Sequence, residues 1–451
     1  MPRSLVTPAD RLYLGIDLGT SGCRAIAIDC DGNVIAECAL PFQPGKHDGY
    51  THEQDPRHWW DITQKVLITL LNHVDADKVH SIAVDGTSGT LLLCDKQGKP
   101  CSVALMYNDE RSTEQAAKIA AIAPQDSAAH GASSALAKLM YLQEQPDIAR
   151  ASKTSLKSTR HAQFQADWIA GQLCHRSDVS DENNCLKLGY DIVKREWPEW
   201  FSALNIDTSL LPQVLAPGTA TGIIDNRMAT ALGLPNSTQI LAGTTDGVAA
   251  FMATGANNIG DAVTSLGSTL VLKVLSDKPV FAPEYGVYSH RLGDRWLVGG
   301  ASNCGGGTLL NYFSHKQLDS MSKRLNPDQS TGLDYYPLPD EGERFPVNDH
   351  NKQPCLTPRP EDDVVFYQGI LEGIAKIEAR GYQLLAELGA APPTSIRTVG
   401  GGARIAGWTQ IRSNFLNMAI KTARHQQAAF GTANLARMAD KDLQSTSVAS
   451  C

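Results

Sequence analysis

Short apolar stretches that end in polar, glycine-rich turns recur along this chain. The first occupies residues 12–40, where LYLGID and CRAIAID are followed by a C-D-G-N turn and then by VIAECAL. Alternation of apolar and polar positions with a period of two predicts strands, and an Asp-Gly pair predicts a tight turn between them. We therefore expect residues 11–40 to form a β-hairpin.

The same pattern returns three times. KVHSIAVDGTSGTLLLCD (78–95) repeats the order strand, glycine turn, strand, and QILAGTTDGVAAFMATG (239–255) and GDAVTSLGSTLVLKVLS (260–276) have the same character. A strand that enters a glycine turn early in both halves favours two related α/β domains. We expect a first domain over residues 1–242 and a second over 243–451, whose last helix, about 427–445, is able to pack back on the first domain.

Two longer segments have the 3.6-residue periodicity of helices. Residues 57–74 place Trp59 and Ile62 on one apolar stripe, and residues 362–389 do the same before Gly389, where a helix cap is expected. Residues 314–361 are rich in Pro, Asp and Lys, so we interpret them mostly as surface loop.

Length, charge and cysteine spacing exclude several classes of protein. A chain of 451 residues is too long for one hydrophobic core of ordinary size, which favours two domains. Its net charge of −8 argues against non-specific nucleic-acid binding. The ten cysteines form no C-x-x-C pair, which favours reduced thiols in a cytosol-like compartment. With neither a signal peptide nor an apolar run of about 18 residues, we expect a cytoplasmic protein without a membrane partner, either a monomer or a homodimer.

The opening glycine turn, D-L-G-T-S-G, matches neither of the two commonest phosphate-binding motifs. Glycines let the backbone wrap closely around phosphates, and small residues such as Thr20 and Ser21 donate without bulk. The loop has no lysine, so Mg²⁺ would have to supply the positive charge, and Asp17 is placed to hold that ion through water. Taken alone, Asp17 fits a common structural role better, which is to cap a turn, and only the other motifs of the chain favour the metal-binding role.

Asp246, in GTTDGVAA, is the candidate general base. Phosphoryl transfer needs an acceptor hydroxyl oriented toward the γ-phosphate, and a nearby carboxylate can orient that hydroxyl and take its proton. The alternative is a plain helix N-cap, a structural role worth about 1 kcal/mol.

Six motifs occur here in the order found in one family: GIDLGTSGCRAIAID, HEQDPRHWW, DGTSGT, GTTDGVAAFMATG, SLGST and GGGARIAGWTQIR. From about residue 12 to 440 the chain resembles the FGGY carbohydrate kinases, and within them the small D-ribulose kinase (xylulokinase-like) branch of cyanobacteria and plants. The resemblance implies an α/β fold of two ribonuclease-H-like (actin/Hsp70-type) domains flanking a cleft. It also implies ATP and Mg²⁺ as cofactors and a small-molecule sugar as substrate.

The resemblance implies roles for particular residues. Asp246 would be the catalytic base, and Asp17 and Asp246 would hold the metal. The nucleotide would contact three loops. The first comprises Gly19, Thr20, Ser21 and Gly22. The second, near the β- and γ-phosphates, comprises Gly267, Ser268 and Thr269, and the third, near the α-phosphate and adenosine, comprises Gly400, Gly401, Gly402 and Ala403. The second glycine run, NCGGGTL (303–309), would form part of the nucleotide cleft wall.

Sugar recognition would fall to the first domain, with Asp17, Ser88 and Asp246 as the best candidates. YNDER (107–111) resembles the family's aromatic-x-Asp-x-Arg element, so Asp109 and Arg111 would line the sugar side, although a surface ion pair is nearly as common an explanation. Larger relatives carry a Gly-Gln-Met-His-Gly-like element where this chain has DGTSGTLLL. That departure removes their sugar-contact histidine and counts against a standard xylulokinase.

These observations lead to one functional hypothesis and two rivals. We expect ATP-dependent phosphorylation of the terminal hydroxyl of a ketopentose, first of all D-ribulose to D-ribulose 5-phosphate, with domain closure excluding water. The nearer rival is the same reaction on D-xylulose or another polyol. The more distant rival is a nucleotide-driven binding protein of the Hsp70 type.

Overall fold

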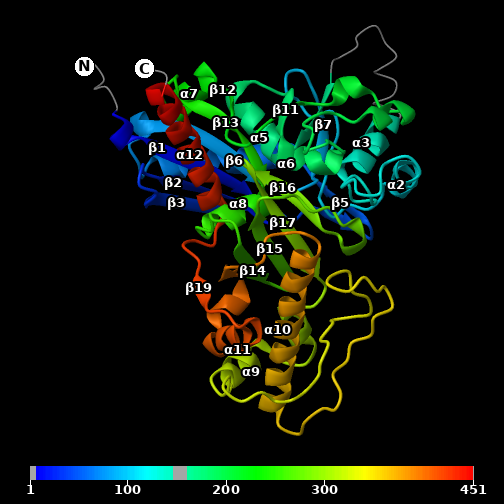
Figure 1. The fold of residues 1–451 in the computed structure, drawn as a ribbon. Helices are drawn as coiled ribbons and strands as arrows, with labels where there is room; N and C mark the ends of the chain where they lie inside the picture. The colour runs from blue at the N-terminus through cyan, green and yellow to red at the C-terminus, as the bar shows by residue number, and fades with distance from the viewer. Residues whose placement is uncertain (1–6, 146–159, 450–451) are drawn as a thin grey trace. The chain divides into compact units, whose positions relative to one another are not determined.

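The computed structural model describes residues 7–145 and 160–449. Residues 1–6, where the expectation of no signal peptide applies, lie outside the described residues. The chain folds as two compact units (Figure 1). Unit 1 comprises Met1–Ala253 together with Gln427–Cys451, and unit 2 comprises Thr254–Gln426. No helix of the described residues is long and apolar enough to cross a membrane.

A six-stranded sheet forms the centre of unit 1. Its order is β12 (Ala220–Ile223), β13 (Gln239–Thr245), β6 (Val79–Gly86), β1 (Leu12–Leu18), β2 (Gly22–Ile28), β3 (Val34–Pro41). β13, β6 and β1 are parallel to one another, whereas β2, β3 and β12 run antiparallel to their neighbours. The hairpin predicted over residues 11–40 is confirmed and extends to three strands.

Helices cover both faces of this sheet. α1 (Pro56–Leu71), which confirms the helix predicted from residue 57 onward, and α5 (Gln165–Cys174) bury Trp59 and Trp168 in the core of one face. On the other face, α8 (Asp246–Ala253) and α12 (Ala428–Ala449) pack together over Tyr13 and Ile26. α12 approaches β1 so closely that a Cβ atom on Gly15 would lie 2.1 Å from the Ala429 carbonyl oxygen, so only glycine fits there.

A second sheet of unit 1 has the order β4 (Lys46–Asp48), β5 (Thr51–Gln54), β8 (Ala104–Leu105), β7 (Leu91–Asp95), β9 (Arg160–Phe164). α2 (Thr113–Ala120) and α3 (Ala135–Glu144) lie beside it, and the shorter elements β10 (Val179–Asp181), α6 (Glu182–Cys185), β11 (Gln213–Leu215) and α7 (Asn226–Leu232) complete the unit. β6 and β7 therefore belong to different sheets, unlike the opening hairpin that their sequence resembles. The turn between them is held by Gln165, whose side-chain oxygen accepts from the Thr87 backbone N–H at 3.0 Å.

Unit 2 is built on another six-stranded sheet. Its order is β16 (Tyr288–Leu292), β17 (Arg295–Ser302), β15 (Leu270–Ser276), β14 (Asp261–Leu266), β18 (Ser395–Val399), β19 (Ile420–Thr422). The long helix α10 (Asp363–Glu387), predicted over residues 362–389, packs on β15, β17 and α11 (Ala406–Leu416). Inside this layer the guanidinium of Arg412 binds the carboxylate of Glu378 at 2.6 Å, with both side chains fully buried.

Residues 314–361 are more ordered than the surface loop that we expected. They contain α9 (His315–Ser322), and they bury Tyr335, Leu338 and Phe345. The ring of Tyr335 meets that of Phe366 on α10 edge-on, with 5.8 Å between centroids. The segment is irregular yet covers an apolar face of unit 2, because its aromatic side chains bury surface that periodicity does not reveal.

The boundary between the units differs from the expected position after residue 242. β13 runs to Thr245 and α8 begins at the next residue, so no linker separates them, and α8 packs against α12. The first segment of unit 1 therefore ends at Ala253, and the C-terminal helix belongs to unit 1.

Candidate functional site

Three carboxylates of unit 1 meet where its parallel strands end. Asp17 on β1 pairs in register with Asp85 on β6, and Asp85 pairs in turn with Thr244 on β13. Asp246 follows β13 directly as the first residue of α8. Because the carboxyl ends of parallel strands share one edge of a sheet, the fold brings together side chains that are far apart in the sequence.

Burial and mutual repulsion perturb this group of carboxylates. Desolvation raises the pKa of Asp17 to about 6; repulsion from Asp246 acts in the same direction, and hydrogen bonding with Asp85 and the charge of Arg24 oppose it. The nearest guanidinium nitrogen of Arg24 lies 3.8 Å from the Asp17 carboxylate. At neutral pH, Asp17 is therefore mainly ionised.

Asp85 is in a different state. Complete burial, followed by the charge of Asp17, raises its pKa well above the ordinary value, although a hydrogen bond from the Thr432 hydroxyl on α12 works against this. Its other oxygen, Oδ1, is buried and has no hydrogen-bond partner among the described residues. We expect Asp85 to carry the proton of the group at neutral pH.

The turn after β6 adds a hydroxyl to this edge. Ser88 Oγ is buried and accepts or donates no hydrogen bond within the described part of the chain. The neighbouring Thr87 is held in place by Gln165, so the turn is fixed while the Ser88 hydroxyl remains available. An available hydroxyl beside carboxylates suits a ligand that has hydroxyl groups, because it can both donate and accept.

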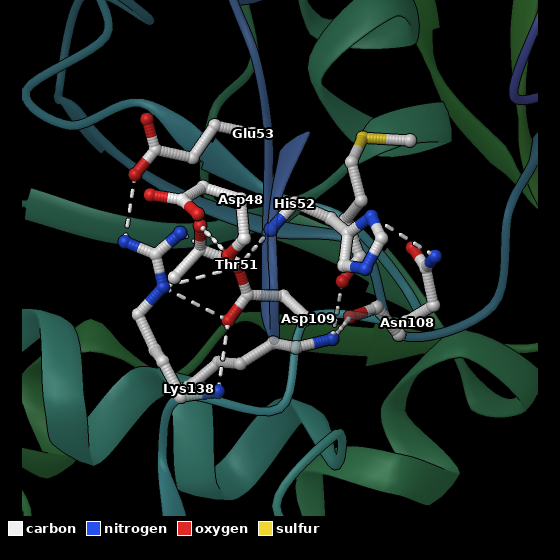
Figure 2. Close-up of polar contacts among 10 residues, drawn as sticks. Asp48, Thr51, His52, Glu53, Asn108, Asp109 and Lys138 are labelled. Carbon is white, nitrogen blue, oxygen red and sulfur yellow. Dashed lines mark hydrogen bonds and ion pairs between the residues drawn. The ribbon is translucent and has the colours of Figure 1, made fainter. Parts of the chain in front are cut away.

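Asp109 and Arg111 form a compact ion pair (Figure 2). The Asp109 side chain is fully buried and receives Arg111 Nη2 at 2.7 Å and the His52 backbone N–H at 2.7 Å. Arg111 also reaches Glu53, with Nη1 2.6 Å from Oε1. The pair is buried rather than superficial, and it ties β5 to the segment after β8; its role beside the sugar stays a prediction.

The glycine loop of residues 17–22 forms a small hollow in unit 1. The Gly19 N–H donates to the Gly22 carbonyl at 3.0 Å, and the Thr20 carbonyl accepts from Gln54 Nε2 at 3.0 Å. The hollow beside the loop is about 290 Å³ and is lined by Asp17, Gly19, Ser21 and Gly22, with neighbours on β2 and β3. The two side chains at the tip of the loop, Thr20 and Ser21, are exposed.

A larger cavity, of about 840 Å³, lies within unit 2. Gly267 and Ser268, from the turn after β14, and Gly401 and Gly402, from the turn after β18, line it together with Gly306 and Gly307 and with side chains of α9 and α11. Thr269, Gly400 and Ala403 support these turns without lining the cavity. The volume is in the range of cofactor sites, and α11 begins beside it.

The three glycine turns of unit 2 are held by backbone contacts. The N–H groups of Gly306 and Gly307 donate to the carbonyls of Gly267 and Ser268 at 2.9 and 3.1 Å. Gly400 has φ +90°, and a Cβ atom there would lie 2.6 Å from the Leu266 carbonyl oxygen. The cavity wall therefore depends on backbone packing that tolerates no side chain at this position.

Comparison with known proteins decides the family. Residues 12–253 match the N-terminal domain of the FGGY family of carbohydrate kinases, and residues 262–439 match its C-terminal domain. The chain belongs to the FGGY family of carbohydrate kinases. Among relatives of this FGGY chain, a xylulose kinase of Escherichia coli is 25% identical over 95% of this chain and 90% of its own, and one of Lactococcus lactis is 26% identical over 90% and 83%.

Solved structures agree on the fold. A "xyloylose kinase" from Brucella ovis superposes on the FGGY chain with a TM-score of 0.86 at 23% identity, covering 96% of this chain and 91% of that one. A glycerol kinase from Plasmodium falciparum with ADP gives 0.81 at 18% identity, covering 96% and 90%. The expected fold of two actin/Hsp70-type domains is confirmed.

The donor set of this FGGY chain suits a hydrated divalent cation. No group of three His, Cys, Asp or Glu side chains with metal-binding geometry occurs among the described residues. Mg²⁺ typically keeps several waters and takes one or two carboxylates together with substrate phosphates. Asp17, ionised at neutral pH, and Asp246 are compatible with that mode, and the buried Oδ1 of Asp85 marks an edge that still has hydrogen-bonding capacity.

Asp85 was not singled out from the sequence of this FGGY chain, although a signal was present. D-L-G-T-S-G begins with Asp17 and D-G-T-S-G begins with Asp85, so each aspartate lies at the end of a strand just before a Gly-Thr-Ser turn, with one residue, Leu18, intervening in the first motif. Pairing the two motifs would have pointed to two adjacent parallel strands that end in carboxylates.

Proposed function

We propose that this FGGY kinase transfers the γ-phosphoryl group of ATP to the terminal hydroxyl of a ketopentose, with D-ribulose as the first candidate. The observation that carries the proposal is the group of Asp17, Asp85 and Asp246 at the ends of three parallel strands, followed in the turn after β6 by the buried Ser88 hydroxyl, which has no hydrogen-bond partner in the described part of the chain. Such a group can orient an alcohol, accept its proton and hold a cation near a phosphate.

Each carboxylate has a distinct part in this proposal. Asp246 orients the acceptor hydroxyl and takes its proton as the bond to phosphorus forms. Asp17 holds Mg²⁺, which neutralises charge on the phosphate oxygens when it is bound. Burial and the charge of Asp17 raise the pKa of Asp85 and favour its neutral form, so Asp85 adds little negative charge to the group.

ATP is assigned to the glycine turns. The cavity of unit 2 would take the nucleoside and the first phosphates against Gly401 and Gly402, and Gly267 and Ser268 would contact the outer phosphates. Backbone N–H groups in such turns bind phosphate oxygens without a lysine. The loop of residues 17–22 in unit 1 would supply further donors from Thr20 and Ser21.

D-xylulose is the second candidate, and a separate observation favours it. The relatives from Escherichia coli and Lactococcus lactis are named xylulose kinases and align over nearly the whole chain. DGTSGT in place of a histidine-containing element favours D-ribulose, because a serine hydroxyl and an imidazole offer different donors and acceptors to a sugar. Cytoplasmic location and a monomeric or homodimeric state stay predictions.

A coupled assay of ADP release across ketopentoses and polyols tests the proposal. We expect rapid turnover with D-ribulose and slower turnover with D-xylulose, L-ribulose and glycerol; faster turnover of D-xylulose would reverse the choice of sugar. ATP hydrolysis indifferent to every sugar but stimulated by peptide would favour an Hsp70-like protein instead.

The Asp246→Asn variant tests the catalytic role directly. It should bind ATP and sugar and lose several orders of magnitude in kcat, because orientation and proton acceptance are lost together. Asp61→Asn, an exposed carboxylate on α1, is the matched control and should keep wild-type activity. Near-normal phosphorylation by Asp246→Asn would refute the assignment.

A further inference from the structure

Two lysines converge on the turn of residues 86–90, from different elements of unit 1. Lys138 on α3 donates from Nζ to the Gly89 carbonyl at 2.8 Å and to the Met106 carbonyl at 2.7 Å. Lys187 reaches the neighbouring Ser88 carbonyl at 3.4 Å. The two ammonium groups therefore flank the turn that carries the available hydroxyl of Ser88.

The surroundings of these lysines differ. Lys138 is fully buried and has two short hydrogen bonds to carbonyls, which is the pattern of a structural lysine. Lys187 is partly accessible and has one long hydrogen bond within the described residues. An ammonium has three N–H donors, so Lys187 retains donors that no acceptor among the described residues takes up.

The position of Lys187 is fixed by its neighbours in the chain. The Asp181 carboxylate accepts from the backbone N–H groups of Asn183 and Asn184 at 2.8 and 3.1 Å and so caps α6, which leads directly into the 3-10 turn of Leu186–Leu188. Asn183 Nδ2 donates to Thr244 Oγ1 at 3.0 Å and ties this segment to β13, just before Asp246.

Lys187 and Asp246 also interact electrostatically. Desolvation lowers the pKa of Lys187, and the Asp246 carboxylate acts in the opposite direction. A donor-only group thus lies near an acceptor-only group, and the donor also contacts the backbone carbonyl of Ser88, whose hydroxyl can both donate and accept. A polyol needs this combination, since each of its oxygens can accept and each hydroxyl can donate.

We propose that Lys187 is a specificity-determining residue of the acceptor site, whose ammonium donates to a sugar oxygen next to the hydroxyl that Asp246 orients. This inference rests on the proposed function, since it assigns a sugar contact at the same site. A hydrogen bond from a charged donor contributes enough to change binding by about ten- to a hundredfold.

Lys187→Met is the primary variant, because methionine keeps the alkyl chain that lies against Gly89 and removes the ammonium. We expect kcat/KM for the sugar to fall about ten- to a hundredfold, mainly through KM, with KM for ATP unchanged. Lys194→Met is the matched control: it removes an exposed lysine, 3.9 Å from Asp191 in the same segment, and should leave both constants unchanged.

A set of monodeoxy ketopentoses separates a sugar contact from a structural effect. Removing the oxygen that Lys187 binds should weaken wild-type turnover strongly and Lys187→Met turnover little, whereas removing any other oxygen should weaken both equally. Equal losses with every deoxy sugar would overturn the inference, as would wild-type sugar KM in Lys187→Met. If Lys187→Met melts below wild type, Lys187→Gln replaces the charged donor with a neutral one and should show a smaller dependence on the same sugar oxygen than wild type does. A dependence on that oxygen as large as in wild type would overturn the inference, as would equal losses with every deoxy sugar.

The outcomes also separate this inference from the proposed function. A wild-type protein that phosphorylates no sugar of the panel refutes the proposed function and with it the inference. A wild-type protein that phosphorylates a ketopentose while Lys187→Met does so equally well refutes the role of Lys187 alone.

Discussion

Replacing Asp17 with asparagine should stabilise the protein while it abolishes phosphorylation. The pKa of Asp17 rises from 3.8 in the unfolded chain to about 6 in the fold, chiefly because the carboxyl is buried. The folded state therefore binds more protons than the unfolded state between these values, so this group's stabilising contribution falls as pH rises through that range. At about 1.4 kcal/mol per pKa unit, the ionised Asp17 costs about 3 kcal/mol above pH 7 relative to its neutral form.

Asparagine resembles the neutral carboxyl in shape and cannot ionise. The free energy of unfolding of Asp17→Asn should thus exceed that of wild type by about 3 kcal/mol near pH 8, and by about half of that near pH 5. The measurement is urea unfolding followed by tryptophan fluorescence, with EDTA present because a bound cation would stabilise wild type alone.

The difference between the two proteins is the informative quantity, since pKa shifts at groups that do not interact with Asp17 cancel in it. Asp61→Asn, which removes an exposed carboxylate on α1, should follow wild type at both pH values. If the curves of Asp17→Asn and wild type stay parallel between pH 5 and pH 8, Asp17 is not held in an unfavourable charged state, and the account of the carboxylate group is wrong.

Three further changes probe other parts of the molecule. Gly400→Ala should raise KM for ATP without changing KM for sugar in steady-state assays, because its Cβ would lie 2.6 Å from the Leu266 carbonyl oxygen beside the cavity of unit 2. Unchanged ATP kinetics would contradict the assignment of ATP to that cavity. Arg412→Met should lower the free energy of unfolding, measured by urea titration, by about 3–5 kcal/mol, because it leaves Glu378 charged and buried. Adding Glu378→Gln to this variant should restore much of the lost stability, and no recovery would argue against an uncompensated charge. Asp85→Asn should keep kcat within about tenfold of wild type, because burial and the charge of Asp17 raise the pKa of Asp85 and favour its neutral form, which asparagine mimics. A loss as large as that of Asp246→Asn would show that the charge of Asp85 is needed.

The sequence predicted the local structure well where one period dominates. The strands of residues 11–40, the helix from residue 57 and the helix of residues 362–389 all lie near their predicted positions, because their apolar residues recur with the period of a strand or a helix. Residues 314–361 lack such a period, and their buried aromatic side chains find partners on α10, far away in the sequence. Contacts of this kind are set by the tertiary fold and leave no local pattern.

The candidate site likewise contains residues that the sequence identified and residues that it did not. Asp17 and Asp246 each follow an apolar strand and precede or lie in a glycine turn, so both were identified from the sequence alone. Asp85 and Lys187 were not, since their significance depends on β6 lying between β1 and β13 and on Asn183 bonding to Thr244. These are relations between strands and loops that are separated by tens of residues or more.

The membership of α12 in unit 1 has a consequence for how the chain is made. During synthesis, every element of unit 2 has been translated once residue 426 is added, yet α12, which covers Tyr13 and Ile26, has not. One apolar face of the first sheet, including the Gly15 contact with Ala429, must therefore wait uncovered while all of unit 2 is produced. Nascent chains stalled just before residue 427 should accordingly be favoured clients of chaperones that bind exposed apolar strands.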